Sequence, residues 1–501
     1  MKLAVLHYHL GHGGVTRVVA NHLASLAAAK APIERVLLLH GGDASGWVEP
    51  PLPFPVEHVV IPELAYDESN RDGWSLAATL RAKLSDSGAG CDETVVHTHN
   101  HSLGKNVAVA GALRELAAEG WPLLLQIHDF AEDFRAAGYA RLVAAFGGGY
   151  GETLYPQFER THYAVLNGRD RGVLADAGID DERLHFLPNP VSPMPTCDTD
   201  DLHALRRQLR AQCQDRFGIA PDEEFWLYPV RGIRRKNLGE SLLLAHLLEP
   251  HGVKVGVTLA PANPKELAYY DAWREFAAAE RIPFAFGSGE PGELSFAENL
   301  LACDRTVTTS VAEGFGMVFL EGWPIDLGGR NLPEITSDFV SSGLNLSGLH
   351  DRVDVTLTAD ERDAHLDALA EAYSALAVGY GRDVISRREA EVAFERSLVD
   401  GRCDFGSLHE QQQMSVIRRL RGTVEGDRLV QTFHRPPLAA DLRSQNADVV
   451  AREYSLAGSG HRLAAIYRQL LESGGGERPE IDAAVVLDRL LSLDRFRLIR
   501  A

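Results

Sequence analysis

The sequence predicts an α/β protein with two doubly wound, Rossmann-like domains and an additional helical region at the carboxyl end. At 501 residues the chain is too long for one ordinary hydrophobic core. Short apolar runs alternate along it with longer helix-like segments, a pattern typical of parallel sheets covered by helices on both faces. A proline-rich stretch over 187–203 interrupts this alternation and predicts a linker between the two domains.

The first domain is expected over residues 1–190. Its first strand is KLAVLHYH at 2–9, and the glycine-rich segment GHGGVTR that follows is expected to be a turn. The Ala- and Leu-rich segment 18–29 is expected to form a helix that packs back on the sheet. Further buried strands are expected at 35–40, 56–61, 94–99, 123–129 and 161–167.

The second domain is expected over residues 215–355, after a linker over 191–214. Its strands are expected at 223–230, 254–260, 282–287, 304–310 and 324–329, and two of its helices at 237–248 and 293–302. Residues 356–501 are rich in Ala, Leu, Glu and Arg, which predicts helices that include a crossover to the first domain. Because ligands bind at the carboxyl ends of parallel strands, we expect a ligand cleft between the two sheets.

Charge and composition exclude several classes of protein. The formal net charge is −20, whereas binding to nucleic acid or anionic lipid needs a clustered excess of Lys and Arg. No run of 18 apolar residues predicts a transmembrane helix, and the opening MKLAVLHYHLGHGG is not typical of a signal peptide. Five scattered cysteines without a C-x-x-C pair favour reduced thiols. A cytoplasmic protein is therefore expected.

The glycine turn after the first strand is a candidate ligand contact. Gly13 and Gly14 would let the backbone approach an anion, while the start of the next helix offers unpaired N–H groups. The segment does not fit G-x-G-x-x-G, because Thr16 stands at the third glycine position, and it lacks the lysine of a P-loop. A purely structural tight turn stays an equal alternative.

Histidines end two of the predicted strands. Alternation places His97, His99 and His101 on one face, an arrangement that can hold a metal ion. Polar residues at the carboxyl end of a strand more often line a cleft, and nothing nearby completes a ligand set, so we expect no metal. A neutral His128 could hydrogen-bond a substrate hydroxyl, although a single histidine is more often structural.

A cluster of cations follows the first strand of the second domain. Arg231, Arg234, Arg235 and Lys236 lie within six positions in a chain that has 20 more acids than bases. A guanidinium fork together with a lysine charge suits a diphosphate. The alternative interpretation is a solvated loop. It is less favoured, because the cluster lies at the end of a strand.

The segment AEGFGMVFLE, residues 312–321, places two carboxylates eight positions apart. The glycine-flanked turn at 314–316 is expected to be open to a ligand, with a helix starting at Met317. The N–H groups at this helix start would attract phosphate, and Glu313 and Glu321 would accept hydrogen bonds from sugar hydroxyls. A buried strand-to-helix turn with two solvated acids is the alternative.

These residues resemble a known family. Glu313 to Glu321 matches the E-x7-E signature of retaining glycosyltransferases with the GT-B fold, particularly the large family 4, and the resemblance covers roughly residues 1–350. The further matches are Gly13-Gly14, His128-Asp129, Asn189-Pro190-Val191, the pair Arg231 and Lys236, Ser310, and the loop 329–335.

The resemblance implies transfer of a hexose from a nucleotide-diphosphate sugar to a hydroxyl acceptor, with retention of configuration and with neither cofactor nor metal. It implies that Glu313 holds donor-sugar hydroxyls and that Glu321 holds ribose hydroxyls. Arg231 and Lys236 would neutralise the leaving diphosphate, and His128 would face the reacting sugar. The other implied donor contacts are Gly13, Gly14, Ser310, Gly314, Phe315, Gly316, Met317 and Val318.

Other functions stay open at this point. A nucleotide-sugar 2-epimerase of the same fold and a non-catalytic nucleotide-sugar-binding protein share the implied site, whereas a phosphorylase is disfavoured because no lysine context suggests pyridoxal phosphate. Pro324 is expected to end the helix after Glu321 early. The first domain has more acids than bases and no basic amphipathic helix, which favours a soluble small molecule or saccharide as acceptor. The helical tail could bind acceptor or form a homo-oligomer.

Overall fold

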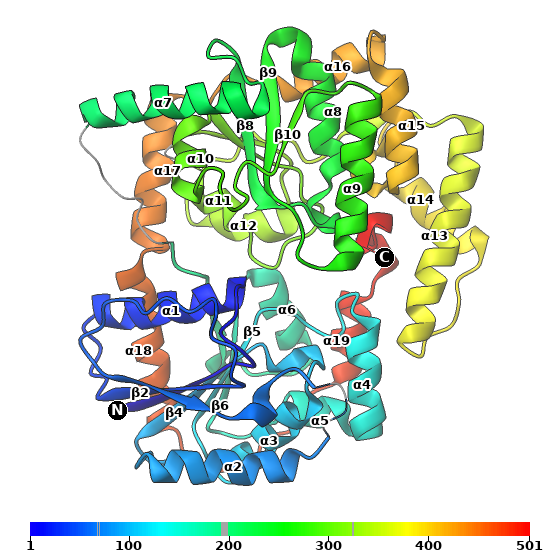
Figure 1. The fold of residues 1–501 in the computed structure, drawn as a ribbon. Coiled ribbons are helices and arrows are strands. Elements are labelled where there is room, and N and C mark those ends of the chain that lie inside the picture. Colours follow the sequence, from blue (N-terminus) through cyan, green and yellow to red (C-terminus); the bar gives the residue numbers. More distant parts are fainter. Residues whose placement is uncertain (68, 70, 192–198, 323–324, 501) are drawn as a thin grey trace. The chain divides into compact units, whose positions relative to one another are not determined.

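The computed structural model describes residues 1–67, 69, 71–191, 199–322 and 325–500. The chain divides into two compact units (Figure 1). Unit 1 consists of Met1–Pro193, Leu376–Asp383 and Ala451–Ser492, and unit 2 consists of Met194–Ala375, Val384–Val450 and Leu493–Ala501. The helical carboxyl-terminal region therefore contributes segments to both units.

Unit 1 contains a seven-stranded parallel sheet in the order β3-β2-β1-β4-β5-β6-β7. The strands are β1 (Lys2–Leu6), β2 (Arg35–His40), β3 (Val56–Val60), β4 (Thr94–His99), β5 (Leu123–Ile127), β6 (Thr161–Val165) and β7 (Leu184–Phe186). The first six confirm the strands expected from the sequence. The seventh was not predicted, because three residues carry too little periodicity.

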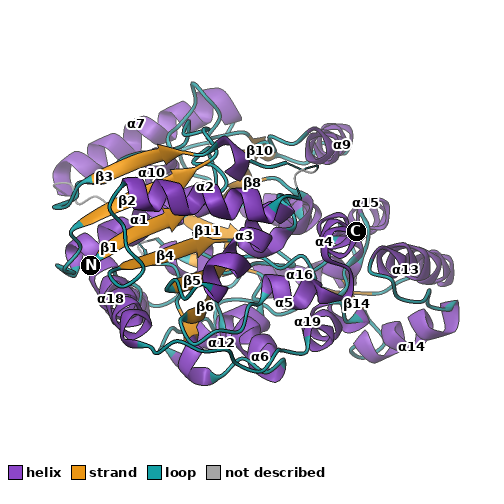
Figure 2. Ribbon diagram, turned by 90° about the horizontal axis from the view of Figure 1, so that it is seen from below, coloured by secondary structure: helices purple, strands orange, loops and turns teal. Residues whose placement is uncertain are grey.

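Alternation along the strands of unit 1 divides its core into two faces. Leu3 and Val5 of β1 pack with apolar residues of α1 (Gly14–Ala28) and α18 (Leu456–Glu472). Ala4 and Leu6 point to the opposite face and pack with α2 (Gly73–Asp86) and α3 (Val107–Ala118). Helices therefore flank the strands on both sides (Figure 2), as expected for a doubly wound sheet.

The remaining helices of unit 1 lie between these strands or come from the carboxyl-terminal region. They are η1 (Pro62–Leu64), η2 (His101–Leu103), α4 (Ala136–Phe146), η3 (Gly147–Gly149), α5 (Tyr150–Leu154), α6 (Gly168–Asp176), η4 (Asp181–Arg183) and α19 (Ala483–Leu490). Helix α1 begins at Gly14, so the turn expected over 11–17 is wrong in its second half. Gly14 to Arg17 already have helical hydrogen bonding, since the Arg17 N–H donates to the Gly13 carbonyl.

Unit 2 contains a five-stranded parallel sheet in the order β10-β9-β8-β11-β12. The strands are β8 (Glu224–Arg231), β9 (Val253–Leu259), β10 (Phe284–Phe286), β11 (Arg305–Thr308) and β12 (Leu327–Gly329). All five confirm predicted strands. A short antiparallel pair, β13 (Asp354–Val355) and β14 (Cys403–Asp404), was not predicted because two-residue strands leave no sequence pattern.

Helix α8 (Leu238–Leu248) is buried on every side, as its apolar sequence requires. It packs against β9, α9 (Pro264–Ala279), and two helices of the carboxyl-terminal region, α15 (Glu410–Leu420) and α16 (Val424–Phe433). The additional helices therefore complete the core of unit 2 around α8.

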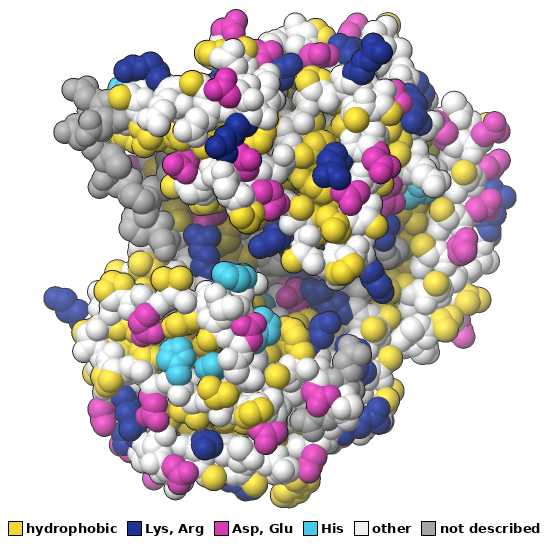
Figure 3. Space-filling view, viewed as in Figure 1, with side chains coloured by type: hydrophobic (Ala, Val, Ile, Leu, Met, Phe, Trp, Pro, Cys, Tyr) yellow, Lys and Arg dark blue, Asp and Glu magenta, His cyan; other side chains and the backbone are white. Residues whose placement is uncertain are grey.

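The other helices of unit 2 begin with α7 (Thr199–Phe217), so residues 199–214 of the expected linker are helical. The rest are η5 (Arg234–Lys236), η6 (Glu249–His251), α10 (Phe296–Ala302), α11 (Val318–Glu321), α12 (Pro333–Ser341), α14 (Arg387–Ser397), η7 (Phe405–Ser407), η8 (Leu493–Arg495) and η9 (Leu498–Arg500). Two helices, α13 (Ala359–Gly379) and α17 (Ala440–Glu453), begin in unit 2 and end in unit 1. Among the described residues no helix is long and apolar enough to cross a membrane. Charged side chains of both signs are interspersed over the face seen in Figure 3.

Candidate functional site

A buried carboxylate lies at the centre of the candidate site in unit 2. Glu313, which is 9% exposed, accepts from Lys236 and, at 2.8 Å, from Arg235 Nη1. The Ser310 hydroxyl donates to Glu313 Oε1 at 2.5 Å, and the hydroxyls of Tyr228 and Ser310 lie 2.6 Å apart. The structure therefore brings together three residues that the sequence predicted separately: Lys236, Ser310 and Glu313.

The charges of this cluster hold Glu313 ionised. Burial by itself would raise the pKa of the carboxyl group, but the positive charges of Lys236 and Arg235 outweigh burial and lower the pKa to about 2. For Lys236 the balance is reversed, because burial and the neighbouring Arg235 lower its pKa more than Glu313 raises it. An anion placed beside Lys236 would compensate this cost of burial.

The local backbone explains how Lys236 reaches Glu313. Residues 234–236 form one turn of 3-10 helix, and Asn237 ends that turn in the left-handed conformation with φ of 52°. The Thr309 hydroxyl donates to the carbonyls of Lys236 and Asn237 at 2.9 and 3.1 Å. The Val311 N–H donates to the Arg235 carbonyl at 3.0 Å. The loops that follow β8 and β11 are thus bonded to each other at the carboxyl edge of the sheet.

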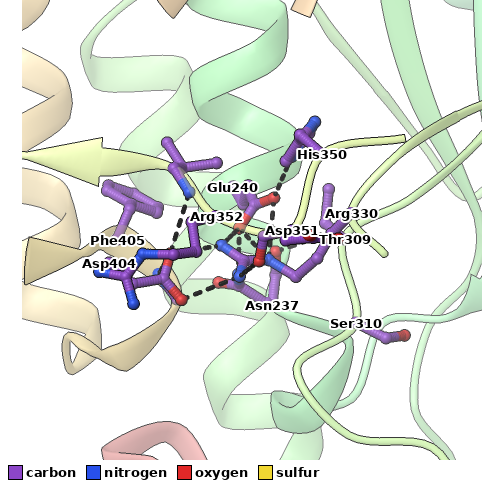
Figure 4. Close-up of polar contacts among 12 residues, drawn as sticks. Asn237, Glu240, Thr309, Ser310, Arg330, His350, Asp351, Arg352, Asp404 and Phe405 are labelled. Carbon is purple, nitrogen blue, oxygen red and sulfur yellow. Dashed lines mark hydrogen bonds and ion pairs between the residues drawn. The ribbon is translucent and has the colours of Figure 1, made fainter. Parts of the chain in front are cut away.

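A second buried ion network lies next to these loops (Figure 4). Arg330 donates to Glu240 of α8, with Nη2–Oε2 at 2.6 Å, and to Asp404 of β14, with Nη2–Oδ1 at 2.8 Å. His350 Nε2 lies 3.1 Å from Glu240 Oε1. Glu240 also accepts from the Asn237 side chain at 2.9 Å, so the network holds the residue next to Lys236.

The segment 314–321 has the turn and helix start that the sequence predicted. Gly316 has φ of +86°, and a Cβ at this position would lie 2.7 Å from the Phe319 ring, so glycine is required there. Met317 is the N-cap of α11, and the N–H groups of Phe319, Leu320 and Glu321 already donate to the carbonyls of Gly316 and Met317, so a ligand would meet the N–H groups ahead of Phe319. The helix has only four residues, so it offers local N–H donors rather than a long helix dipole. The expected helix break at Pro324 lies outside the described residues.

The structure does not bring Arg231 into the cluster. Arg231 is exposed at the end of β8, and its Nη1 donates to the Ala260 carbonyl at 3.4 Å. Arg235 takes the place beside Glu313 instead, and sequence reasoning did not select it as a site residue. The signal was the run Arg234-Arg235-Lys236, but only the fold decides which guanidinium faces the carboxylate, because Arg234 pairs with Glu410.

In unit 1, the glycine turn leaves open space. Cβ atoms added to Gly13 or Gly14 would meet no heavy atom within 4 Å, so the chain itself does not require glycine there. Gly13 is the N-cap of α1 in an extended conformation without a side-chain cap. The space beside the two glycines is therefore open, and their role as ligand contacts stays a prediction.

His128 directly follows β5 and is 7% exposed. Its Nε2 lies 3.0 Å from His99 Nδ1, which leaves Nδ1 of His128 as the ring nitrogen able to meet a ligand. Burial lowers the pKa of His128 to about 4, although Asp129 opposes this shift, so the imidazole is neutral at neutral pH. Of the three histidines on the neighbouring strand and turn, His101 lies apart and bonds to the Leu154 carbonyl at 2.8 Å.

Comparison with known proteins gives one relative by sequence and several by fold. No model of a known protein family matches the chain. The mannosylglucosyl-3-phosphoglycerate synthase of Petrotoga mobilis is 27% identical over 410 residues, which cover 80% of this chain and 78% of that protein.

Two solved structures share the fold. Anabaena Alr3699/HepE in complex with UDP-glucose has a TM-score of 0.51 at 13% identity, covering 93% of this chain and 98% of that one. The sucrose-phosphate synthase of Thermosynechococcus elongatus has a TM-score of 0.52 at 13% identity, covering 94% and 98%. The fold and the sequence relative together support a glycosyltransferase of the GT-B fold.

Proposed function

We propose that this protein is a cytoplasmic, metal-independent glycosyltransferase that moves a hexose from a nucleotide-diphosphate sugar to a hydroxyl acceptor with retention of configuration. The observation that carries the proposal is the buried cluster of Glu313, Lys236 and Arg235 at the carboxyl edge of the unit 2 sheet. This edge is where α/β folds bind nucleotides. Four cysteines of the described chain, at positions 91, 213, 303 and 403, are unpaired thiols, as expected in the cytoplasm.

The donor would bind with its diphosphate beside Lys236. A phosphate oxygen placed there would share the lysine with Glu313 and offset the cost of burying the ammonium group. Arg231 is exposed, so its long side chain can move from the Ala260 carbonyl to the same diphosphate. Backbone N–H groups from Phe315 to Val318 would contact the donor sugar or phosphate.

Glu313 would hold the donor sugar through its hydroxyls, and Ser310 would keep the carboxylate in place. Both carboxylate oxygens already accept hydrogen bonds, so a sugar hydroxyl would share Oε2 with Arg235 or Oε1 with Lys236. Glu321 would hold the ribose, because the last residue of α11 lies one turn from the proposed phosphate contacts.

No residue is proposed as a covalent nucleophile. The acceptor oxygen would bond to the anomeric carbon on the face that the diphosphate leaves, as the bond from that carbon to the leaving oxygen breaks. The acceptor proton would pass to a departing phosphate oxygen. Lys236 and Arg231 would stabilise the charge that develops on the diphosphate. His128 would hydrogen-bond the reacting sugar through Nδ1, while Gly13 and Gly14 leave room for donor or acceptor.

The name of the sequence relative suggests which donor and acceptor to propose for this chain. Its name describes a product in which a mannosyl group is joined to glucosyl-3-phosphoglycerate. We propose by analogy a mannosyl donor and a small, phosphorylated glycoside as acceptor, which agrees with the soluble small saccharide expected from the composition of the first domain. The nucleotide of the donor is not assigned.

Mannose and glucose esters of UDP, GDP and ADP, supplied with glucosyl-3-phosphoglycerate or with its dephosphorylated form, test this proposal. Transfer to the phosphorylated acceptor is expected with one nucleotide, and Glu313→Ala should abolish it. Glu293→Ala is the matched control, because Glu293 is a partly exposed acid of unit 2 outside the cluster.

Two other outcomes would contradict the transferase. Tight donor binding without turnover for any acceptor would indicate a nucleotide-sugar sensor. Release of a sugar altered at carbon 2, without any acceptor, would indicate an epimerase.

A further inference from the structure

Three buried histidines in unit 1 lie close enough to share one ion. His22 of α1 and His97 and His99 of β4 are 2%, 1% and 1% exposed. One ring nitrogen from each lies within 4.8 Å of the others. The ring centroids of His97 and His99 are 4.3 Å apart, and that of His22 is 5.7 and 5.5 Å from them. Two separate elements therefore direct imidazoles to one point in the core.

Several nitrogens of this group have no hydrogen-bond partner in the described part of the chain. They are both ring nitrogens of His22 and Nε2 of His99, all completely shielded from solvent. A neutral imidazole always carries one N–H group, and leaving such a group buried without an acceptor is unfavourable. Apolar residues would fill this place at no such cost, so the unpaired nitrogens point to something that binds them.

The outer nitrogens of the other two rings are held by neighbours. His97 Nε2 lies 2.9 Å from Gln126 Oε1, an oxygen that only accepts, so Nε2 carries the hydrogen. Nδ1 of His97 then accepts a hydrogen bond from the Tyr467 hydroxyl of α18 at 2.8 Å, so Tyr467 must turn its hydrogen away when Nδ1 binds an ion. His99 Nδ1 is bonded to His128 Nε2 at 3.0 Å, which leaves Nε2 of His99 toward the group. Second contacts of this kind orient histidines that ligate metals.

We propose that His22, His97 and His99 bind one transition-metal ion of the Zn²⁺ class. Imidazole nitrogen is a preferred ligand of such ions. Zn–N bonds of about 2.05 Å in a tetrahedral site require nitrogens about 3.4 Å apart, so nitrogens that now lie within 4.8 Å of one another would approach by up to about 1.4 Å when the ion binds. The Tyr467 hydroxyl, 2.8 Å from His97 Nδ1, is a candidate for the fourth position. The sequence led us to expect no metal, because it offered only His97, His99 and His101 together; it could not anticipate that His22 joins the first two.

The ion would be structural and would stand apart from the donor chemistry proposed for unit 2. It would join α1, which begins at the glycine turn, to β4 in the centre of the sheet. Through His99 it would also fix the ring of His128, because the hydrogen bond between these two residues persists when His99 ligates by Nε2. The proposed ion would therefore stabilise the positions of two predicted ligand contacts, the glycine turn before α1 and His128.

The full chain, stripped with EDTA and dialysed, tests this site with two probes, Zn²⁺ and Co²⁺. We expect about one Zn²⁺ per chain to remain bound through gel filtration and to raise the melting temperature. Bound Co²⁺ should show the intense visible absorption of four-coordinate cobalt. His22→Leu should weaken Zn²⁺ binding about 100-fold or more, since even loss of a residue that only orients a ligand costs 10- to 100-fold.

Two controls keep the test decisive. Without metal, His22→Leu removes an unpaired buried group, so it should melt at the same temperature as the stripped wild type or higher. His101→Gln changes a buried histidine outside the group and should keep the ion. Three results would each overturn the site: the chain fails to retain Zn²⁺, bound Co²⁺ gives a six-coordinate spectrum, or His22→Leu binds Zn²⁺ as tightly as the wild type. Bound water would then account for the unpaired nitrogens, or surface histidines for any metal that binds.

Discussion

Replacing Glu313 with glutamine tests the buried cluster of unit 2 most directly. The substitution keeps the shape of the side chain but removes the anion that pairs with Lys236 and Arg235. The side chains of Glu313 and Lys236 are 7% and 13% exposed, so solvent screens their interaction only weakly. Breaking a buried ion pair by removing one partner costs about 3–5 kcal/mol, because the other charge stays buried.

The pKa of Glu313 gives a similar magnitude. It falls from 4.5 to about 2 on folding, and each pKa unit corresponds to about 1.4 kcal/mol, so ionised Glu313 stabilises the fold by roughly 3 kcal/mol. Because the folded pKa is depressed, this stabilisation is complete above pH 4.5 and disappears as the pH falls toward 2. Lys236 offsets part of it, since burial lowers the pKa of the lysine. We expect Glu313→Gln to lose about 2–3 kcal/mol at pH 7.

Urea unfolding followed by tryptophan fluorescence measures this loss. Trp226 and Trp273, both fully buried, lie in unit 2 and report its unfolding. The difference between wild type and Glu313→Gln should be constant from pH 8 to 5 and shrink below pH 4.5. Glu293→Gln, which removes a partly exposed pair with Arg216, should cost less than about 1 kcal/mol. An equally small effect for Glu313→Gln at pH 7, or a difference that persists unchanged at pH 3, would refute the reasoning.

Four further predictions concern individual residues of both units. Lys236→Ala and Arg231→Ala should each lower turnover about 100-fold or more through lost stabilisation of the leaving diphosphate, and unchanged rates in both would remove the mechanism as drawn. Gly316→Ala should destabilise unit 2 by about 1–3 kcal/mol in the same urea assay, because its φ is positive and its Cβ has no space. Gly13→Ala should leave stability within about 0.5 kcal/mol yet raise KM, whereas an unchanged KM would mean that no substrate approaches this turn. Arg330→Met should lower stability by about 3–5 kcal/mol, measured by thermal unfolding, since it leaves Glu240 and Asp404 buried without their cation.

The sheets of both units could be predicted because their signal is local. Buried parallel strands require short, nearly continuous apolar runs, and segments such as RVLLLH and KVGVTLA can bury both faces only in a covered sheet. Strands β7, β13 and β14 escaped prediction because two or three residues are paired by their surroundings rather than by their own pattern.

The candidate site was predictable only in part. Lys236, Ser310 and Glu313 follow strands, and parallel topology brings such residues to one edge. Which arginine pairs with Glu313, Arg231 or Arg235, depends on the turn of 3-10 helix over 234–236, and the spacing of residues in the sequence does not predict that turn. Arg330 joins acids that lie 90 residues before it and 74 residues after it, and such distant pairs leave no local trace.

The sequence by itself therefore determined which segments are buried, in which kind of element, and which charged residues stand at strand ends. Only the tertiary structure decided which of these residues meet: Arg235 with Glu313, His22 rather than His101 with His97 and His99, and the carboxyl-terminal helices with α8. The physical reason is that burial follows from the periodicity of neighbouring residues, whereas partners are selected by packing and charge between segments far apart in the chain.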